Sequence, residues 1–307
     1  MCKISVIIPV YNRETTILRC LDSLKSQTFD DYEIIIINDG STDKSEELIN
    51  EYSGNFRRFQ YISIDNNGVS NARNIGILKS NGKYVTFLDS DDTYQENFLA
   101  SMYNQISIND ADACFCGHFI VNSYDEKKKA KIYFKKSNLL INYLKNKTTP
   151  NTNSWIIRRD ILINKRLFFE VGNNLGEDMI FFTSLILVTK NINFVKAYLT
   201  NYYISTEDSL SKKIDDKVQR DFLWMNKLKK NINDSDISTR EKHKSIKIIE
   251  RYRLPVGILN TIFYSNNSFE EKKKLFKKNK NSIKKMKLVN GVRSLKGLII
   301  YLYFSIK

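Results

Sequence analysis

Short apolar runs alternate with amphipathic segments along the first hundred residues. Four of the apolar runs have the length and β-branched content of buried strands: Ile4–Val10, Tyr32–Ile37, Phe59–Ile64 and Tyr84–Leu88. Helices are predicted for the intervening segments Thr16–Ser26, Lys44–Tyr52 and Val69–Ser80. Strands that alternate with helices predict an α/β fold, in which a mostly parallel sheet is flanked by helices on both faces.

Polar residues follow each predicted strand at its carboxyl end. In chain order they are Tyr11 with Asn12, Asp39, Asp65 with Asn66, and Asp89 with Asp91. Open α/β sheets bind ligands at this edge, so four polar ends in succession predict the rim of a nucleotide-sized site. A GxGxxG motif after the first strand and a GxxxxGK[ST] motif are both absent from the sequence, which disfavours dinucleotide oxidoreductases and P-loop enzymes.

Three carboxylates, Asp89, Asp91 and Asp92, terminate the strand Tyr84–Leu88. In an extended segment the side chains of Asp89 and Asp91 leave on the same face. Such a pair suits a divalent cation that is shared with substrate phosphates. Asp92 is assigned instead to capping the next helix.

Composition separates the chain into two parts. Its 307 residues carry 49 Lys and Arg against 34 Asp and Glu, and the segment 212–307 alone holds 25 Lys and Arg against 9 Asp and Glu.

Four cysteines without a CxxC pair, together with two histidines, indicate a reduced, cytoplasmic protein without a zinc site. The apolar run Gly297–Ile306 is too short to span a bilayer, which requires about 20 residues.

Four segments resemble the family 2 glycosyltransferases, bacterial inverting enzymes with the GT-A (Rossmann-like) fold that use nucleotide sugars. The matching segments are SVIIPVYN (Ser5–Asn12), NDGSTD (Asn38–Asp43), GVSNARNIGI (Gly68–Ile77) and FLDSDD (Phe87–Asp92). The resemblance implies a GT-A domain over residues 1–211, with a nucleotide-binding half over about 1–120 and an acceptor half over about 121–211. A basic, mainly helical region, 212–307, follows.

The resemblance assigns nucleotide contacts to residues at the sheet edge. Pro9 and Tyr11 would flank uracil, Asp39 would accept a hydrogen bond from the uracil N–H, and Arg73 would contact the base or the diphosphate. The alternatives from the residues alone are an ordinary aromatic at a strand end for Tyr11, a turn cap for Asp39 and an exposed ion pair for Arg73.

The catalytic assignments rest on the same resemblance. Asp89 would lie near the ribose hydroxyls, and Asp91 would bind Mn²⁺ or Mg²⁺ that bridges the diphosphate and stabilises the departing UDP. Asp178 would be the general base that activates the acceptor hydroxyl, and Glu177 would orient sugar hydroxyls. The alternative for the Glu177–Asp178 pair is an N-terminal helix cap.

Two further segments have looser counterparts in the family. Trp155 either stacks on an acceptor sugar or anchors the core. Ser209 and Ser211 are candidate phosphate contacts in the segment Tyr202–Ser211. Relatives often carry an Arg after the tyrosines of this segment, whereas this chain has Ile204, and charge neutralisation would then fall to Lys212 and Lys213.

The basic tail favours peripheral contact with the anionic inner face of the cell membrane, with solvated helix faces as the alternative. Nucleic-acid binding is disfavoured because the tail has no recognition module. The sequence also leaves a homo-oligomer open.

We therefore predict an inverting hexosyl- or N-acetylhexosaminyltransferase. It would move a sugar from a UDP-sugar to a hydroxyl of a bacterial surface glycan (capsule, lipopolysaccharide, teichoic acid or glycoprotein glycan), including a lipid-linked one. Two alternatives stay open, a non-catalytic sugar-nucleotide-binding or scaffolding partner of another transferase, and a nucleotidyltransferase that releases pyrophosphate.

Overall fold

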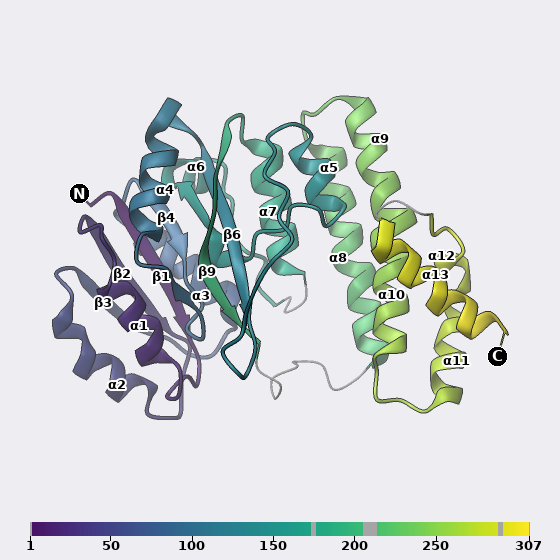
Figure 1. Ribbon diagram of the computed structural model, residues 1–307, viewed down its shortest axis with the longest axis horizontal. Coiled ribbons are helices and arrows are strands. Elements are labelled where there is room, and N and C mark those ends of the chain that lie inside the picture. The colour runs from purple at the N-terminus through teal and green to yellow at the C-terminus, as the bar shows by residue number, and fades with distance from the viewer. Residues whose placement is uncertain (1, 173–175, 205–213, 288–290, 307) are drawn as a thin grey trace. The chain divides into compact units, whose positions relative to one another are not determined.

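The computed structural model describes residues 2–172, 176–204, 214–287 and 291–306 (Figure 1). The chain forms two compact units. The first comprises Met1–Lys136 and Thr149–Thr206, and the second comprises Ser137–Thr148 and Glu207–Lys307. The short segment Ser137–Thr148 thus interrupts the first unit in sequence and folds with the second.

The first unit is built on a nine-stranded sheet with the order β3-β2-β1-β4-β8-β6-β9-β5, and β7 pairs with β6. The strands are β1 (Ile4–Val10), β2 (Tyr32–Asn38), β3 (Phe59–Ser63), β4 (Tyr84–Phe87), β5 (Thr93–Tyr94), β6 (Ala113–Val121), β7 (Lys127–Lys129), β8 (Trp155–Arg158) and β9 (Ile192–Tyr203). The first four are parallel to one another, and β6 is parallel to β9. Every antiparallel pair involves β5, β7 or β8. The predicted α/β sheet is therefore confirmed.

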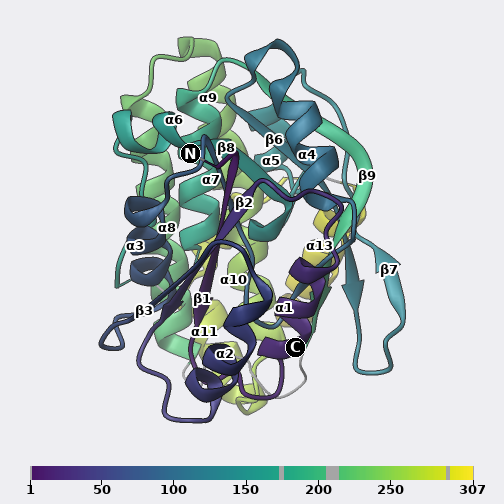
Figure 2. The ribbon, with the colours of Figure 1, turned by 90° about the vertical axis from the view of Figure 1, so that its left-hand side faces the viewer.

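Helices cover both faces of this sheet, because successive side chains of each strand point to opposite sides. On one face, α1 (Ile17–Lys25), α2 (Ser45–Tyr52) and α4 (Phe98–Ser107) share a core with the even-numbered residues of β1, such as Val6 and Ile8. On the other face, α3 (Val69–Lys79) packs on β1 and β2. Figure 2 shows α1 and α3 on opposite sides of these strands. The remaining helices are α6 (Arg159–Asn164) and α7 (Glu177–Val188).

The predicted boundaries agree with the structure to within two residues in this region. The strand predicted at Tyr32–Ile37 extends to Asn38, and the helix predicted from Lys44 begins at Ser45. Cys114 and Cys116 are buried in β6 and pack in the core.

The second unit is helical. Its elements are α5 (Leu139–Leu144), α8 (Ile214–Asp234), α9 (Thr239–Ile248), a π-helical turn (Ile249–Arg253), α10 (Leu254–Phe263), α11 (Phe269–Lys278), α12 (Lys280–Ile283) and α13 (Gly291–Ile306). Helix α10 contacts α8, α11, α12 and α13, so it forms the centre of the unit. Across the described residues, none of the helices is long and apolar enough to cross a membrane.

Candidate functional site

The loops after β1 and β2 are held together by hydrogen bonds at the carboxyl edge of the sheet. Asn12, in the left-handed region with φ of 50°, accepts a hydrogen bond from the backbone N–H of Thr42 at 2.8 Å through Oδ1. Its own N–H donates to Oγ of Ser41 at 3.0 Å. Pro9 is buried in β1, whereas Tyr11 is 45% exposed. Tyr11 therefore presents an open aromatic ring at the predicted base-binding position.

Asp39 is buried at the end of β2 and organises the turn before α3. Its Oδ1 and Oδ2 accept hydrogen bonds from the backbone N–H groups of Asn67 and Gly68, at 2.9 and 2.8 Å. Gly68 has φ of 88°, which favours glycine at this turn. Asp39 thus has the turn-capping role, and because a carboxylate has about four acceptor sites, it retains capacity for a base N–H.

Each of the three carboxylates in the acidic loop after β4 has a different partner. Oδ1 of Asp89 lies 2.6 Å from the Nη2 of Arg73, and Oδ2 of Asp91 lies 3.5 Å from the Nη2 of Arg13. Asp92 accepts hydrogen bonds from the backbone N–H of Tyr203, at 2.9 Å, and from the side-chain amide of Asn153. The predicted capping role of Asp92 is wrong, since α4 begins only at Phe98 and Asp92 is bound to the end of β9 instead.

Asn153 is a site residue that the sequence did not reveal. It is fully buried, its Oδ1 accepts the backbone N–H of Asp89 at 2.9 Å, and its amide nitrogen donates to Asp92. One side chain therefore fixes both ends of the acidic loop. An Asn ahead of a strand has no local pattern that would announce this contact.

The acidic loop fits a hard divalent cation. Partial burial, together with the negative charge of Asp89, raises the pKa of Asp91, so the two carboxylates are close enough to repel each other. Within the described residues, no three His, Cys, Asp or Glu side chains converge as a closed metal cluster. An open site of this kind suits Mg²⁺ or Mn²⁺, which is often held by one or two carboxylates while substrate phosphates and water complete its shell. With a side chain that is 42% exposed, Asp91 is the carboxylate of this loop that such a cation would reach from solvent.

Arg73 connects the acidic loop to the start of α7. Its side chain is 5% exposed, and its Nη1 lies 3.9 Å from Oε1 of Glu177 while Nη2 contacts Asp89. The guanidinium carbon lies 5.1 Å from the ring centroid of Phe169. The exposed ion pair considered for Arg73 is therefore excluded, because its guanidinium is buried and its two acidic partners are only partly exposed.

Aromatic packing fixes the start of α7 beside this cluster. The rings of Phe169 and Phe181 are stacked with centroids 3.9 Å apart, and Phe87 of β4 packs edge-on against both. Asn74 of α3 holds the backbone of Phe169 through two 2.8 Å hydrogen bonds. The last residue of β4, Phe87, and the second turn of α7, which carries Phe181, thus belong to one aromatic cluster.

Glu177 and Asp178 form the first turn of α7, directly after Gly176 in the left-handed conformation. Burial and the charge of Asp178 raise the pKa of Glu177, although Arg73 opposes this shift. Oδ1 of Asp178 accepts the backbone N–H of Met179 at 2.6 Å, which is the contact of an N-terminal helix acid. The structure therefore brings the acids of α7 to Arg73, the same arginine that pairs with Asp89.

The structure rules out the predicted sugar contact of Trp155 and does not describe the predicted phosphate contacts. Trp155 is fully buried and stacks on Phe182 with ring centroids 5.0 Å apart, so it is a core anchor and the sugar-stacking interpretation is wrong. Ser209 and Ser211, with Lys212 and Lys213, lie outside the described residues. Ile204, at the end of β9, is 47% exposed.

Two arginines that the sequence analysis did not assign flank Asp91. Arg13 pairs with its carboxylate, and Arg19 of α1 donates from Nη2 to its backbone carbonyl at 2.7 Å. The Arg19 guanidinium also lies 3.6 Å from the ring centroid of Tyr203. These two side chains supply positive charge beside the acidic loop. The basic residue that relatives often carry after the tyrosines of β9 is replaced in this chain by Ile204.

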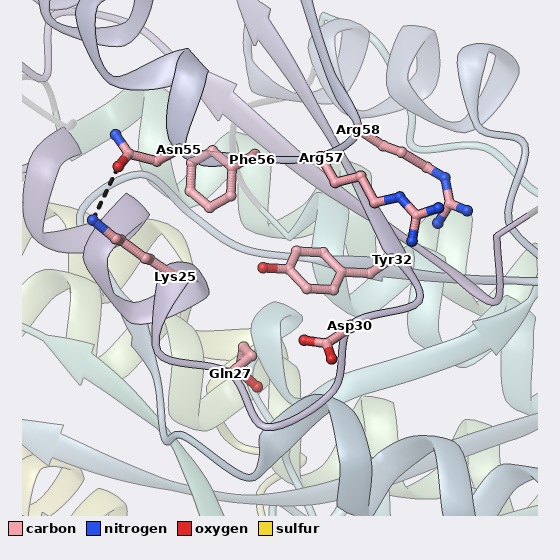
Figure 3. A pocket seen from close by; sticks show the side chains of 8 residues that line it. All are labelled: Lys25, Gln27, Asp30, Tyr32, Asn55, Phe56, Arg57 and Arg58. Atoms are coloured by element: carbon pink, nitrogen blue, oxygen red, sulfur yellow. Dashed lines mark hydrogen bonds between the residues drawn. The ribbon is translucent and has the colours of Figure 1, made fainter.

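A pocket of about 360 Å³ lies at the other end of the strands and has a different character (Figure 3). It is lined by residues that precede β2 and β3, including Lys25, Asp30, Phe56 and Arg57. Lys25 donates to Asn55 at 2.9 Å and Arg58 pairs with Asp31 at 2.9 Å, so two of its cations already have partners. The chemistry-bearing residues are at the opposite, carboxyl edge.

Comparison with known proteins gives relatives whose names describe them as glycosyltransferases, of which two follow. Glycosyltransferase GlyA of Streptococcus pneumoniae is 32% identical over 239 residues, which are 74% of this chain and 33% of GlyA. TarP of Staphylococcus aureus, a poly(ribitol-phosphate) beta-N-acetylglucosaminyltransferase, is 30% identical over 222 residues, 68% of this chain and 64% of TarP. The chain thus spans about a third of GlyA.

A solved structure shares the fold. TarS of S. aureus in complex with UDP-GlcNAc superposes with a TM-score of 0.71 and 21% identity, covering 93% of this chain and 82% of the TarS chain. The likeness confirms the predicted GT-A fold. The model of the family "Glycosyl transferase family 2" matches residues 5–171, more than half of the chain. The protein therefore belongs to glycosyl transferase family 2.

Proposed function

We propose that the chain is an inverting glycosyltransferase that moves a hexosyl or N-acetylhexosaminyl group from a UDP-sugar to a hydroxyl of a bacterial surface glycan. The observation that carries the proposal is the cluster Asp89–Arg73–Glu177, which joins the nucleotide edge of the sheet to the acids of α7. Family membership and the names of TarP and TarS, which concern teichoic-acid polymer and UDP-GlcNAc, support the donor and the class of acceptor. The catalytic part would be residues 1–211.

The donor would bind across the carboxyl edge of the sheet. Tyr11 offers a ring for stacking, Asp39 keeps acceptor capacity for the uracil N–H, and Asp89 would face the ribose. Asp91 would hold Mn²⁺ or Mg²⁺, which supplies charge stabilisation to the leaving diphosphate. Arg13 and Arg19 contact Asp91 and add positive charge at the same position, beside whatever Lys212 and Lys213 contribute.

The reaction would be one in-line displacement. The acceptor oxygen attacks the anomeric carbon, the bond from that carbon to the phosphate oxygen breaks, and UDP departs with the electron pair. Asp178 takes the proton of the acceptor hydroxyl, and Glu177 orients the sugar hydroxyls. Attack opposite the leaving group converts an α-linked donor into a β-linked product, the configuration in TarP's name.

The location proposed for this reaction is the cytoplasmic face of the cell membrane, with peripheral attachment. UDP-sugars are cytosolic, and a lipid-linked acceptor would be reached from that face. The basic segment 212–307 is suited to an anionic surface.

Purified protein tests the proposal. With a UDP-sugar, Mn²⁺ and an acceptor glycan, we expect release of UDP and a β-linked product identified by NMR of its anomeric proton. Asp178→Asn should lower turnover by about 10²–10⁴-fold, the usual contribution of a general base, while UDP affinity is unchanged. Asp160→Asn, an exposed acid on α6, is the matched control and should remain active.

The outcomes separate the alternatives. UDP binding without turnover for any donor would favour a non-catalytic partner, and release of pyrophosphate from a nucleoside triphosphate would indicate nucleotidyl transfer. An Asp178→Asn variant with full turnover would place the base on another residue.

A further inference from the structure

Tyr202, near the end of β9, projects from the face of the sheet that is opposite to α1. Leu199 of the same strand packs in the core that the sheet shares with α1 and α4. The ring centroid of Tyr203 lies 3.6 Å from the guanidinium carbon of Arg19, a residue of α1. Because the side chains of a strand alternate between the two faces of a sheet, Tyr202 lies on the other face.

Helix α7 covers this other face. Ile156 of β8 packs in the core of α1 and α4, so its neighbour Trp155 points away from that core, and Trp155 stacks on Phe182 of α7. The first turn of α7 carries Asp178. Tyr202 therefore shares a face of the sheet with the residue that we propose as the general base.

The position of Tyr202 along β9 brings it to the acidic loop. The backbone N–H of the next residue, Tyr203, donates to Oδ1 of Asp92 at 2.9 Å. Burial raises the pKa of Tyr202, and the negative charges of the three carboxylates of the acidic loop and of Asp178 raise it further. The phenol is thus close enough to interact with the acids of the loop and with the acid of α7.

The ring of Tyr202 is supported on one side and open on another. His118 of β6, which is 8% exposed, lies edge-on to it, with ring centroids 6.4 Å apart and an angle of 84° between the planes. Tyr202 itself is 43% exposed. An aromatic side chain that a buried neighbour already holds loses little conformational freedom when it binds a ligand.

We propose that the ring of Tyr202 packs against the sugar of the nucleotide-sugar donor, between the diphosphate position at Asp91 and the base Asp178. In the displacement described above, the transferred sugar lies between the leaving diphosphate and the attacking hydroxyl. The C–H face of a sugar is apolar and is favourably buried on an aromatic ring. The inference rests on the proposed function, because it names the residue that would bind the donor's sugar.

An acceptor sugar fits this position less well. The acceptor lies beyond the base, on the side away from the diphosphate, whereas Tyr202 directly precedes the residue that is hydrogen-bonded to the acidic loop. Trp155, the aromatic residue first considered for an acceptor sugar, is fully buried.

Isothermal titration of UDP and of UDP-sugars, with Mn²⁺ and without an acceptor, tests the proposal. The UDP-sugar used is whichever of UDP-glucose, UDP-galactose and UDP-N-acetylglucosamine binds the unaltered chain most tightly. Tyr202→Ala should weaken binding of this UDP-sugar by about three- to tenfold, the size of a single aromatic contact, and should leave UDP affinity unchanged. Tyr202→Phe keeps the ring and should bind both ligands nearly as the unaltered chain does.

Two further variants complete the test. Tyr202→Leu fills much of the same space without an aromatic ring, so it should lose the same affinity for the UDP-sugar even if Tyr202→Ala does not fold. Tyr124→Ala, at an 83% exposed tyrosine in the turn between β6 and β7, is the matched control and should bind both ligands as the unaltered chain does.

The proposal is overturned if Tyr202→Ala or Tyr202→Leu, with unchanged UDP affinity, binds the UDP-sugar as tightly as the unaltered chain. A rise in the acceptor KM with unchanged donor affinity would also overturn it, because the ring would then bind the acceptor. Equal affinity of the unaltered chain for UDP and for every UDP-sugar would do the same. Tyr202-dependent binding of a UDP-sugar without any turnover would contradict the proposed transfer alone, so the two failures are distinguishable.

Discussion

At the scale of single residues, the site depends on a buried ion pair. Arg73 is 5% exposed, and the side chain of Asp89 is 27% exposed. Removal of one partner leaves the other charge poorly solvated, which typically costs about 3–5 kcal/mol for a buried pair. Arg73 also contacts Glu177, so the pair affects both the stability of the first unit and the arrangement of its acids.

We predict that Arg73→Met destabilises the chain by about 3 kcal/mol and that Asp89→Asn does so by less. The double variant should be more stable than the sum of the two changes implies, because neither charge is then left alone. Denaturant unfolding of all four proteins measures this coupling. Strict additivity would show that the two side chains do not interact in solution.

His118 makes the stability of the folded chain depend on pH. It is 8% exposed in β6, and its Nδ1 has no hydrogen-bond partner in the part of the chain that the structure describes. Burial lowers the pKa of His118 to about 4, against about 6.5 for an unfolded chain. Below pH 6.5 the unfolded state therefore binds a proton that the folded state excludes.

We predict that this difference removes up to about 3 kcal/mol of stability as the pH falls from about 6.5 to 4. In His118→Gln the loss over that interval should be smaller, whatever the effect of the substitution at pH 7. Urea unfolding at a series of pH values gives, for each of the two proteins, the slope of the unfolding free energy against pH. Equal slopes for the two proteins would mean that His118 is accessible to protons in the folded chain.

At the scale of elements, α3 must approach β1 closely to bring Arg73 to the edge of the sheet. A Cβ atom at Gly76 would lie 2.3 Å from Cγ2 of Ile7. Glycine is therefore needed here for space, although it weakens the helix by about 1 kcal/mol relative to alanine.

We predict that Gly76→Ala destabilises the chain by about 1–3 kcal/mol through overpacking, despite the gain in helix propensity. Gly54→Ala is the matched control, because nothing lies within 4 Å of the added Cβ, and it should be neutral or slightly stabilising. Thermal unfolding compares the two. A neutral Gly76→Ala would show that α3 can move away from β1 without cost.

The elements of the first hundred residues were predictable because their signals are local. Runs such as Ile4–Val10 and Tyr32–Asn38 are apolar on both faces, as a covered parallel strand requires, and polar residues mark their ends. The partners of the acidic loop were not predictable. Arg19 is an exposed residue of an amphipathic helix, and Asn153 precedes a strand, so only the tertiary fold brings them to Asp91 and Asp92.

At the scale of the whole molecule, the segment Ser137–Thr148 belongs to the second unit although the first unit flanks it in sequence. Arg253 is a side chain that holds it there. Its guanidinium donates to the carbonyls of Leu144 and Tyr143, at 2.6 and 2.8 Å, and to the side chain of Asn146 at 2.6 Å. No periodicity in the sequence indicates such a pairing across more than a hundred residues.

We predict that Arg253→Met lowers the stability of the second unit by about 2–3 kcal/mol, because buried carbonyls lose a charged donor. UDP binding by the first unit should be unaffected. Calorimetric unfolding, with Arg251→Met as the control from the same π-helical turn, measures the effect. An unchanged unfolding profile would show that the segment is held by other contacts.

The central claim is that acids at the carboxyl edge of the sheet hold a divalent cation that in turn binds a nucleoside diphosphate. Isothermal titration of UDP into the unaltered chain and into Asp91→Asn, each with and without Mn²⁺, tests it most directly. We expect Mn²⁺ to tighten UDP binding by at least about tenfold, or about 1.4 kcal/mol, in the unaltered chain and to have little effect in the variant. Equal UDP affinity with and without Mn²⁺ in the unaltered chain would contradict the account.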